Sequence, residues 1–194
     1  GNKTLFQDTL DRIKFVGSEN IFIATNKEYE KEIRLESKKY HIPADNFIIE
    51  PALRDTAPCI GLAAKIMSRK TSPKEVMAVI YADHLVQDVK EFRKLLKIAE
   101  KIAREENTLN IIEVKARFPN VNLGYVKIGK LIREIDGVEI YSFEKFVEKP
   151  DLEKAKKFLN SYKYLWNTGF YVWRIEKILE KFQQHMPETY RKLE

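Results

Sequence analysis

Short apolar runs alternate with stretches of helical periodicity through the first half of the chain. The runs of strand length lie at residues 21–24, 47–49 and 76–81. Apolar positions recur every three or four residues in four other stretches, at 5–13, 27–40, 56–67 and 89–104. Short apolar runs predict strands, and apolar positions that recur every three or four residues predict helices. Strands that alternate with helices form βαβ units, so we expect an α/β fold around a mostly parallel central sheet that is flanked by helices.

The second half of the chain has a different pattern. Strand-like segments follow one another at 110–114, 125–128 and 138–147, with no helical stretch between them. A helix is predicted at 152–159, a strand at 170–173 and a closing helix at 175–184. Strands joined without helices pair antiparallel, so we expect a mixed second half that extends the same sheet.

Composition narrows the class of protein. A chain of 194 residues, 44% hydrophobic and 33% charged, can bury one core, so residues 1–194 are expected to form a single domain. Its one cysteine, Cys59, excludes an intramolecular disulfide and fits a cytoplasmic protein. Apolar runs such as 76–82 are too short to cross a membrane. The net charge is +6, but lysines alternate with glutamates at 94–106, which argues against a nucleic-acid partner and leaves an anionic small substrate open.

Asp83 directly follows an apolar run, at a strand end where parallel α/β sheets bind their ligands. A carboxylate beside a buried strand needs a partner that offsets its desolvation. Mg²⁺ would supply one, since it combines one or two carboxylates with substrate phosphates. Asp83 could equally cap the following turn, with His84 packed beside it, and position alone leaves both alternatives open.

Three other groups of polar residues follow predicted strands or turns. After Glu50, Asp55 or Thr56 can cap a helix whose free N–H groups suit an anion or a base edge; a plain capped helix with Arg54 exposed is the simpler alternative. Glu148 and Lys149 place an acceptor and a cation side by side, or form a surface ion pair. Asn167 precedes Gly169, which permits close backbone approach, as in a carbohydrate site or in an ordinary turn.

Taken in order, four motifs resemble those of the mannose-1-phosphate guanylyltransferase family of sugar-phosphate nucleotidyltransferases. They are Glu50-Pro51 with 54–58, Ala82-Asp83-His84, Phe146 to Asp151, and Trp166 to Phe170. The resemblance implies a Rossmann-like (GT-A-like) nucleotidyltransferase domain. It also implies a reaction in which an oxygen of mannose 1-phosphate attacks the α-phosphorus of GTP with Mg²⁺, giving GDP-mannose and pyrophosphate.

The resemblance also implies roles for individual residues. Asp83 would bind the metal and Lys149 would meet the sugar phosphate, and these two are the predicted catalytic residues. Glu148 and Asn167 would hold sugar hydroxyls, and Gly124 would line the sugar side. Gly169, chosen for its close backbone approach, is also among the predicted substrate-binding residues. The nucleotide base would be bordered by Glu50, Arg54, Asp55 and Thr56.

Some positions depart from the family pattern. The family's Gly-rich loop precedes residues that resemble 2–13, and its second metal-binding aspartate follows residue 194, so the domain is expected to be incomplete at both ends. Asp55 stands where the family usually has Asn, and Asn120 to Leu123 replace a Glu-Thr-Gly-Tyr sequence. A thymidylyl- or uridylyltransferase and a non-catalytic sugar-nucleotide-binding or regulatory relative are therefore alternatives. A homodimer is possible, and the sequence does not determine the oligomeric state.

Overall fold

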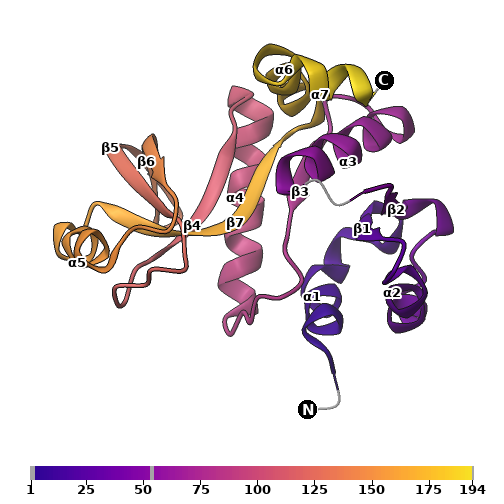
Figure 1. Ribbon diagram of the computed structural model, residues 1–194, viewed down its shortest axis with the longest axis horizontal. Helices are drawn as coiled ribbons and strands as arrows, with labels where there is room; N and C mark the ends of the chain where they lie inside the picture. Colours follow the sequence, from indigo (N-terminus) through magenta and orange to yellow (C-terminus); the bar gives the residue numbers. More distant parts are fainter. Residues whose placement is uncertain (1–2, 53–54, 194) are drawn as a thin grey trace.

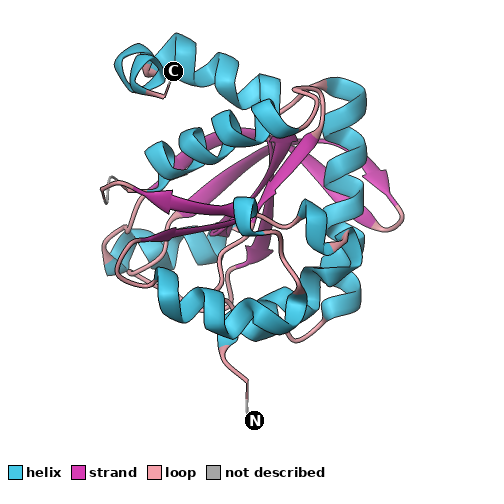
Figure 2. Ribbon diagram, turned by 90° about the vertical axis from the view of Figure 1, so that its right-hand side faces the viewer, coloured by secondary structure: helices cyan, strands magenta, loops and turns pink. Residues whose placement is uncertain are grey.

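The computed structural model describes residues 3–52 and 55–193 and has an α/β fold with two β-sheets among seven labelled α-helices (Figures 1 and 2). In chain order the elements are α1 (Leu5–Ile13), β1 (Ile23–Asn26), α2 (Glu30–Ser37), β2 (Phe47–Glu50), α3 (Thr56–Lys70), β3 (Val76–Val79), α4 (Val89–Glu106), β4 (Asn110–Lys115), β5 (Tyr125–Ile135), β6 (Val138–Val147), α5 (Leu152–Ser161), β7 (Tyr164–Arg174), α6 (Ile175–His185) and α7 (Pro187–Lys192). Short 3-10 turns lie at Lys14–Val16, Ser18–Asn20, Lys38–Tyr40 and Ala44–Asn46.

Every helix predicted from periodicity is present, with ends that differ by a few residues. The largest difference is in α2, which is shorter than predicted at both ends, because residues 27–29 form a turn and the last turn tightens into a 3-10 turn. Helix α7 was not predicted. Within residues 3–52 and 55–193, no helix has the length and apolar character needed to cross a bilayer.

The sheets confirm the α/β class and correct the expected strand pairing. Strands β1 and β2 pair parallel in a two-stranded sheet. The larger sheet has the order β3-β7-β5-β6 with β4 on β7, and its pairings are antiparallel, so the prediction of a single, mostly parallel sheet is wrong. Strands β3 and β4 do run parallel to each other across α4, as a βαβ unit requires. However, β7 inserts between them and runs antiparallel to both.

Strand β7 is the centre of the core, and its side chains alternate between two helical layers. Phe170 and Val172 pack with α4, whereas Trp173 and the partly buried Tyr171 pack in the cluster that contains α3 and α6. This alternation is the two-residue period of a strand that is buried on both faces. Ile48 of β2 belongs to the α3–α6 cluster, so the two sheets share one core.

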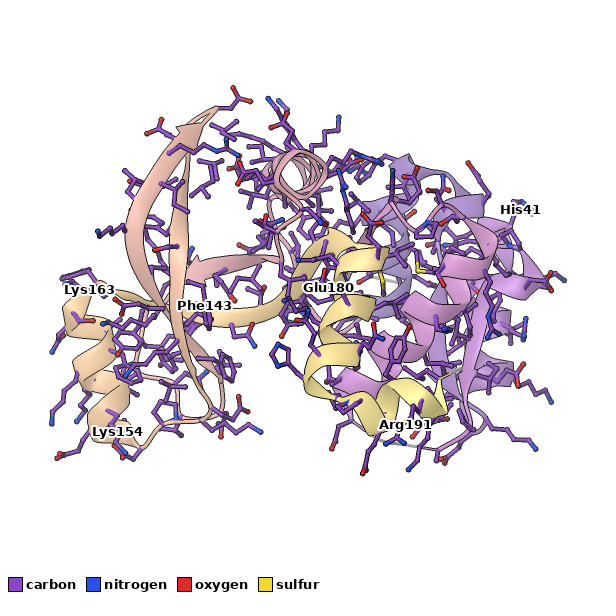
Figure 3. All side chains as sticks on the ribbon, turned by 90° about the horizontal axis from the view of Figure 1, so that it is seen from above. His41, Phe143, Lys154, Lys163, Glu180 and Arg191 are labelled. Atoms are coloured by element: carbon purple, nitrogen blue, oxygen red, sulfur yellow. The ribbon has the colours of Figure 1, made fainter. Side chains whose placement is uncertain are left out.

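The hairpin of β5 and β6 extends from the far end of β7. Its two-residue turn, Asp136-Gly137, has φ of 51° and 77°, the pair of positive values that the commonest two-residue hairpin turn requires. Figure 3 shows this hairpin with Phe143, and α5 with Lys154, on one side of the molecule, and α6 and α7 with Glu180 and Arg191 on the other. The larger sheet therefore links two lobes of the molecule.

Helix α1 fixes the loop that follows β3. Arg12, only 3% exposed, donates from Nη1 to the carbonyl of His84 at 3.1 Å and from Nη2 to Oγ1 of Thr9 at 2.6 Å. The Thr9 hydroxyl donates to the carbonyl of Ala82 at 3.4 Å. Burial lowers the pKa of the Arg12 guanidinium, and these hydrogen bonds offset part of the desolvation cost. Both residues that flank Asp83 are thereby held by α1.

Replacement of Arg12 by Met should destabilise the fold, because Met retains the packing but leaves the His84 carbonyl without its donor. We expect the free energy of unfolding to fall by about 2 kcal/mol, measured by urea denaturation. Arg104→Met is the matched control. Arg104 pairs with Glu75 and Glu100 at the surface, so its loss should cost less than about 1 kcal/mol. Equal losses for the two variants would contradict the role given to Arg12.

Candidate active site

Asp83 extends from the anchored loop with its carboxylate in solvent. Its side chain is 81% exposed, and Oδ1 lies 3.1 Å from Nδ1 of His84, whose ring packs 5.0 Å from that of Phe170. The cap of the next helix, α4, is Asp88, which accepts the N–H of Glu91 at 2.9 Å. Asp88 thus fulfils the capping role at α4, and the Asp83 carboxylate is available to a ligand.

The chemistry around Asp83 can be tested against a magnesium ion. Magnesium usually takes one or two carboxylates and completes its shell with phosphate oxygens and water. Among the residues that the structure describes, no three His, Cys, Asp or Glu side chains are grouped so that they could hold a metal ion. Asp83 therefore fits an ion whose ligands are mostly phosphate oxygens, rather than an ion that protein side chains alone coordinate.

The start of α3 has no side-chain cap from Asp55, the described residue that precedes it. Asp55 is at the N-cap position with a φ of 65°, which non-glycine residues seldom adopt, and its side chain makes no capping hydrogen bond with the described residues. The first N–H groups of α3 are therefore not capped by Asp55, so they can meet an anion or a base edge. Thr56 is exposed beside them, and Arg54 lies outside the described residues.

Glu50 ends β2 and lies against Cys59 in the first turn of α3. Burial raises the pKa of the Cys59 thiol to about 12, and the charge of Glu50 and its hydrogen bond with the thiol act in the same direction. The thiol is therefore neutral and donates to the Glu50 carboxylate. This contact orients Glu50 and leaves Cys59 as a packing residue without nucleophilic character.

Tyr81 connects the strand ends, and sequence reasoning missed it. Its hydroxyl donates to Oγ1 of Thr56 at 3.2 Å. Its ring lies so close to Gly169 that a Cβ there would sit 2.5 Å from Cε2, and Gly169 has a φ of 73°. The available signal was an aromatic residue two positions before Asp83 at the end of a β-rich run. Tyr81 brings the α3 start and the β7 segment together beside the Asp83 loop.

Four of the residues predicted for the sugar side lie together. The carbonyl of Gly124 accepts the backbone N–H of Asn167 at 2.8 Å, and a Cβ on Gly124 would lie 3.0 Å from Oε2 of Glu148. Nζ of Lys149 is 3.6 Å from Oε1 of Glu148, and both side chains are exposed. Such a surface pair is weak in water, so Lys149 can exchange it for an anionic ligand.

Tyr171 links the two groups of residues. Burial raises the pKa of its hydroxyl, and the charges of Tyr81, Glu113 and Glu148 act in the same direction. The amide nitrogen of Asn167 is 3.5 Å from this hydroxyl. The Tyr171 hydroxyl therefore interacts with residues of both groups, Tyr81 in one and Glu148 in the other. Glu113, like Tyr81, was not predicted from the sequence.

Two surface pockets lie away from these residues. One of about 590 Å³ is lined by lysines of α4 and by Asp136, and one of about 430 Å³ lies between α1 and Tyr40. Neither contains a residue that the strand ends bring together. We place the candidate site at the strand ends because the contacts of Tyr81, Gly124 and Asn167 converge there.

Sequence comparison gives relatives along almost the whole chain. Residues 1–194 match the family model described as nucleotidyl transferase. The alginate biosynthesis protein AlgA of Pseudomonas fluorescens is 31% identical over 190 residues, which is 98% of this chain and 38% of the relative. A mannose-1-phosphate guanylyltransferase of Escherichia coli is 30% identical over 187 residues, which is 95% of this chain and 40% of the relative. The chain thus spans 38–40% of the length of these curated relatives.

Two solved structures superpose on almost the whole chain. A protein described as mannose-1-phosphate geranyltransferase from Thermus thermophilus superposes with a TM-score of 0.80 at 28% identity, covering 98% of this chain and 53% of that one. A protein described as mannose-6-phosphate isomerase from Helicobacter pylori superposes with a TM-score of 0.81 at 25% identity, covering 98% of this chain and 69% of that one. Because one family model matches the chain from end to end, the chain belongs to the nucleotidyl transferase family.

Proposed function

We propose that the protein is a mannose-1-phosphate guanylyltransferase, which makes GDP-mannose and pyrophosphate from GTP and mannose 1-phosphate. The observation that carries the proposal is the contact of Tyr81 with both Thr56 and Gly169. It joins a nucleotide side, with Thr56 and Asp83, to a sugar side, with Gly124, Glu148, Lys149 and Asn167. Mannose phosphates also occur in the names of three of the four proteins compared above, which supports this substrate class.

In the proposed reaction, an oxygen of the sugar 1-phosphate forms a bond to the α-phosphorus of GTP, and the bond from that phosphorus to the pyrophosphate oxygen breaks. The chain has to place two anions in contact and to stabilise the charge that develops between them. Lys149 supplies a mobile cation to the sugar phosphate, while Glu148 and Asn167 accept and donate hydrogen bonds to sugar hydroxyls. Glu50, Asp55 and Thr56 border the base.

Asp83 is the residue of this chain that we assign to Mg²⁺. The ion, when bound, neutralises phosphate charge and so favours attack on the α-phosphorus. The carboxylate of Asp83 is exposed on a backbone that Arg12 and Thr9 hold in place, which suits a ligand that arrives with its own phosphate oxygens.

Two alternatives concern the same site. A uridylyl- or thymidylyltransferase would keep the reaction and change the base, and Asp55 stands at the border where the base would be read. A non-catalytic relative would bind sugar nucleotides without turnover. Substrate tests on the full-length protein distinguish all three.

A pyrophosphate-release assay with mannose 1-phosphate, Mg²⁺ and each of the four nucleoside triphosphates tests the proposal. We expect turnover with GTP to exceed that with the others by at least about tenfold, because a site that hydrogen-bonds one base rejects the rest. Faster turnover with UTP or dTTP would support the change of base instead. Binding without turnover for any pair would support the non-catalytic alternative.

Asp83→Asn should lower Mg²⁺-dependent turnover by about 100-fold or more, because the amide loses the charge that a metal ligand needs. The urea unfolding midpoint should not change, since the side chain is exposed. Asp88→Asn is a matched control five residues later, because Asn caps α4 as well as Asp does. Turnover by Asp83→Asn within a few-fold of the unaltered protein would refute the assignment.

A further inference from the structure

Strand β7 contains a bulge beside β4. Ile112 pairs with Phe170 and Val114 pairs with Trp166. Glu113 alone therefore stands opposite three residues of β7, namely Asn167, Thr168 and Gly169. The surplus residues leave the regular ladder, and the positive φ of Gly169 allows the chain to return to it. We call Asn167–Gly169 the β7 bulge.

Every N–H group from Asn167 to Phe170 has an acceptor. That of Asn167 donates to the Gly124 carbonyl, that of Gly169 to Oδ1 of Asn167 at 3.1 Å, and that of Phe170 to Oγ1 of Thr168 at 3.2 Å. The N–H of Thr168, in the middle, donates to Oε2 of Glu113 at 2.8 Å. Among these four bonds, this is the one that uses a side chain from another strand. Glu113 thus supplies the acceptor for the Thr168 N–H, and a half-buried backbone segment requires such a partner for each of its N–H groups.

The carboxyl group of Glu113 is suited to a fixed structural contact. Its Oε1 is buried and has no hydrogen-bond partner among the described residues. Burial raises the pKa of Glu113 to about 8, although the N–H of Thr168 acts in the opposite direction. The titratable group of β7 that interacts with it is the Tyr171 hydroxyl, on which the charges of Tyr81 and Glu148 also act. At neutral pH the carboxyl group is protonated, so Oε2 accepts as a carbonyl oxygen would.

We infer that Glu113 is a positioning residue for sugar binding, whose carboxyl group fixes the β7 bulge and thereby directs the Asn167 amide toward the sugar hydroxyls. This inference rests on the proposed function, since it needs Asn167 to face a sugar. The amide of Asn167 is oriented by its own contact with the Gly169 N–H, and that contact exists only while the bulge keeps its shape. Without Glu113, the Thr168 N–H loses its acceptor and the bulge can rearrange.

Calorimetric titration of the full-length protein with mannose 1-phosphate at pH 7 tests the inference without requiring turnover. Glu113→Ala should weaken the Kd for mannose 1-phosphate by about tenfold, the effect of losing one well-formed hydrogen bond. The Kd for Mg²⁺ and GTP should not change. Glu113→Gln should bind mannose 1-phosphate within about twofold of the unaltered protein, because a carboxamide reproduces a protonated carboxyl group as an acceptor.

Ile112→Val is the matched control for a general loss of stability. It removes one buried methylene from the preceding residue of β4 but keeps the carbonyl that accepts the Thr168 hydroxyl. We expect it to lower the unfolding midpoint while leaving the Kd for mannose 1-phosphate within about twofold. A purely structural role for Glu113 would instead make the two substitutions weaken sugar binding in proportion to their loss of stability.

The protonation of Glu113 has its own readout. The pKa is about 8 in the folded chain and close to 4.5 when unfolded, so between these values the unfolded chain releases its proton first. Glu113 therefore makes stability fall as pH rises from about 4.5 to about 8, with no further change above that range. The urea midpoint of the unaltered protein should fall more steeply over this window than that of Glu113→Gln.

Each outcome has one meaning. Binding of mannose 1-phosphate by Glu113→Ala as tight as that of the unaltered protein would overturn the inference and leave the proposed function intact. If the urea midpoint fell with pH equally steeply for the unaltered protein and for Glu113→Gln, the conclusion that Glu113 is protonated at neutral pH would be wrong. Failure of the unaltered protein to bind any sugar 1-phosphate would overturn the proposed function itself.

Discussion

Strand β7 has to pair with three strands at once, and the arrangement of the site follows from that requirement. Strands β3 and β4 occupy its two edges near Val172, and β5 takes over at Trp166. The register on the β4 side advances four residues along β7 while it advances two along β4. The surplus becomes the β7 bulge, which puts Asn167 and Thr168 among polar partners in the middle of an otherwise apolar strand.

The charged side chains of Asp83, Glu148 and Lys149 are exposed, whereas the backbones of the Asp83 loop and of the β7 bulge are fixed by their neighbours. The loop of Asp83 is fixed by hydrogen bonds from α1, the backbone of Asn167 is fixed by Gly124, and that of Thr168 is fixed by Glu113. Exposed carboxylates and a lysine on anchored loops can reach a charged ligand without first breaking a core. This division fits a family whose chemistry depends on positioning phosphates more than on a protein nucleophile.

Local pattern was sufficient for the helices and for the strand ends. Asp83 could be found because it follows an apolar run, and Gly169 because a glycine beside polar residues suggests close backbone approach. The insertion of β7 between β3 and β4 could not be found, because strands separated by about 60 to 100 residues of sequence carry no local signal of their partners. Glu113 was missed for the same reason. Its role depends on a register shift between distant strands, whereas its sequence neighbours suggest only an alternating strand.

We propose that the β7 bulge, the start of β5 and the loop after β3 form one sugar-phosphate site. The seven glycines of the chain allow a direct test by NMR with ¹⁵N-glycine labelling and titration of mannose 1-phosphate. Gly124 and Gly169 lie in the proposed site, while Gly17 follows α1 and Gly137 lies at the hairpin turn. The amide signals of Gly124 and Gly169 should shift on titration, whereas those of Gly17 and Gly137 should not. Shifts confined to Gly17 or Gly137, with Gly124 and Gly169 unchanged at saturation, would contradict this proposal.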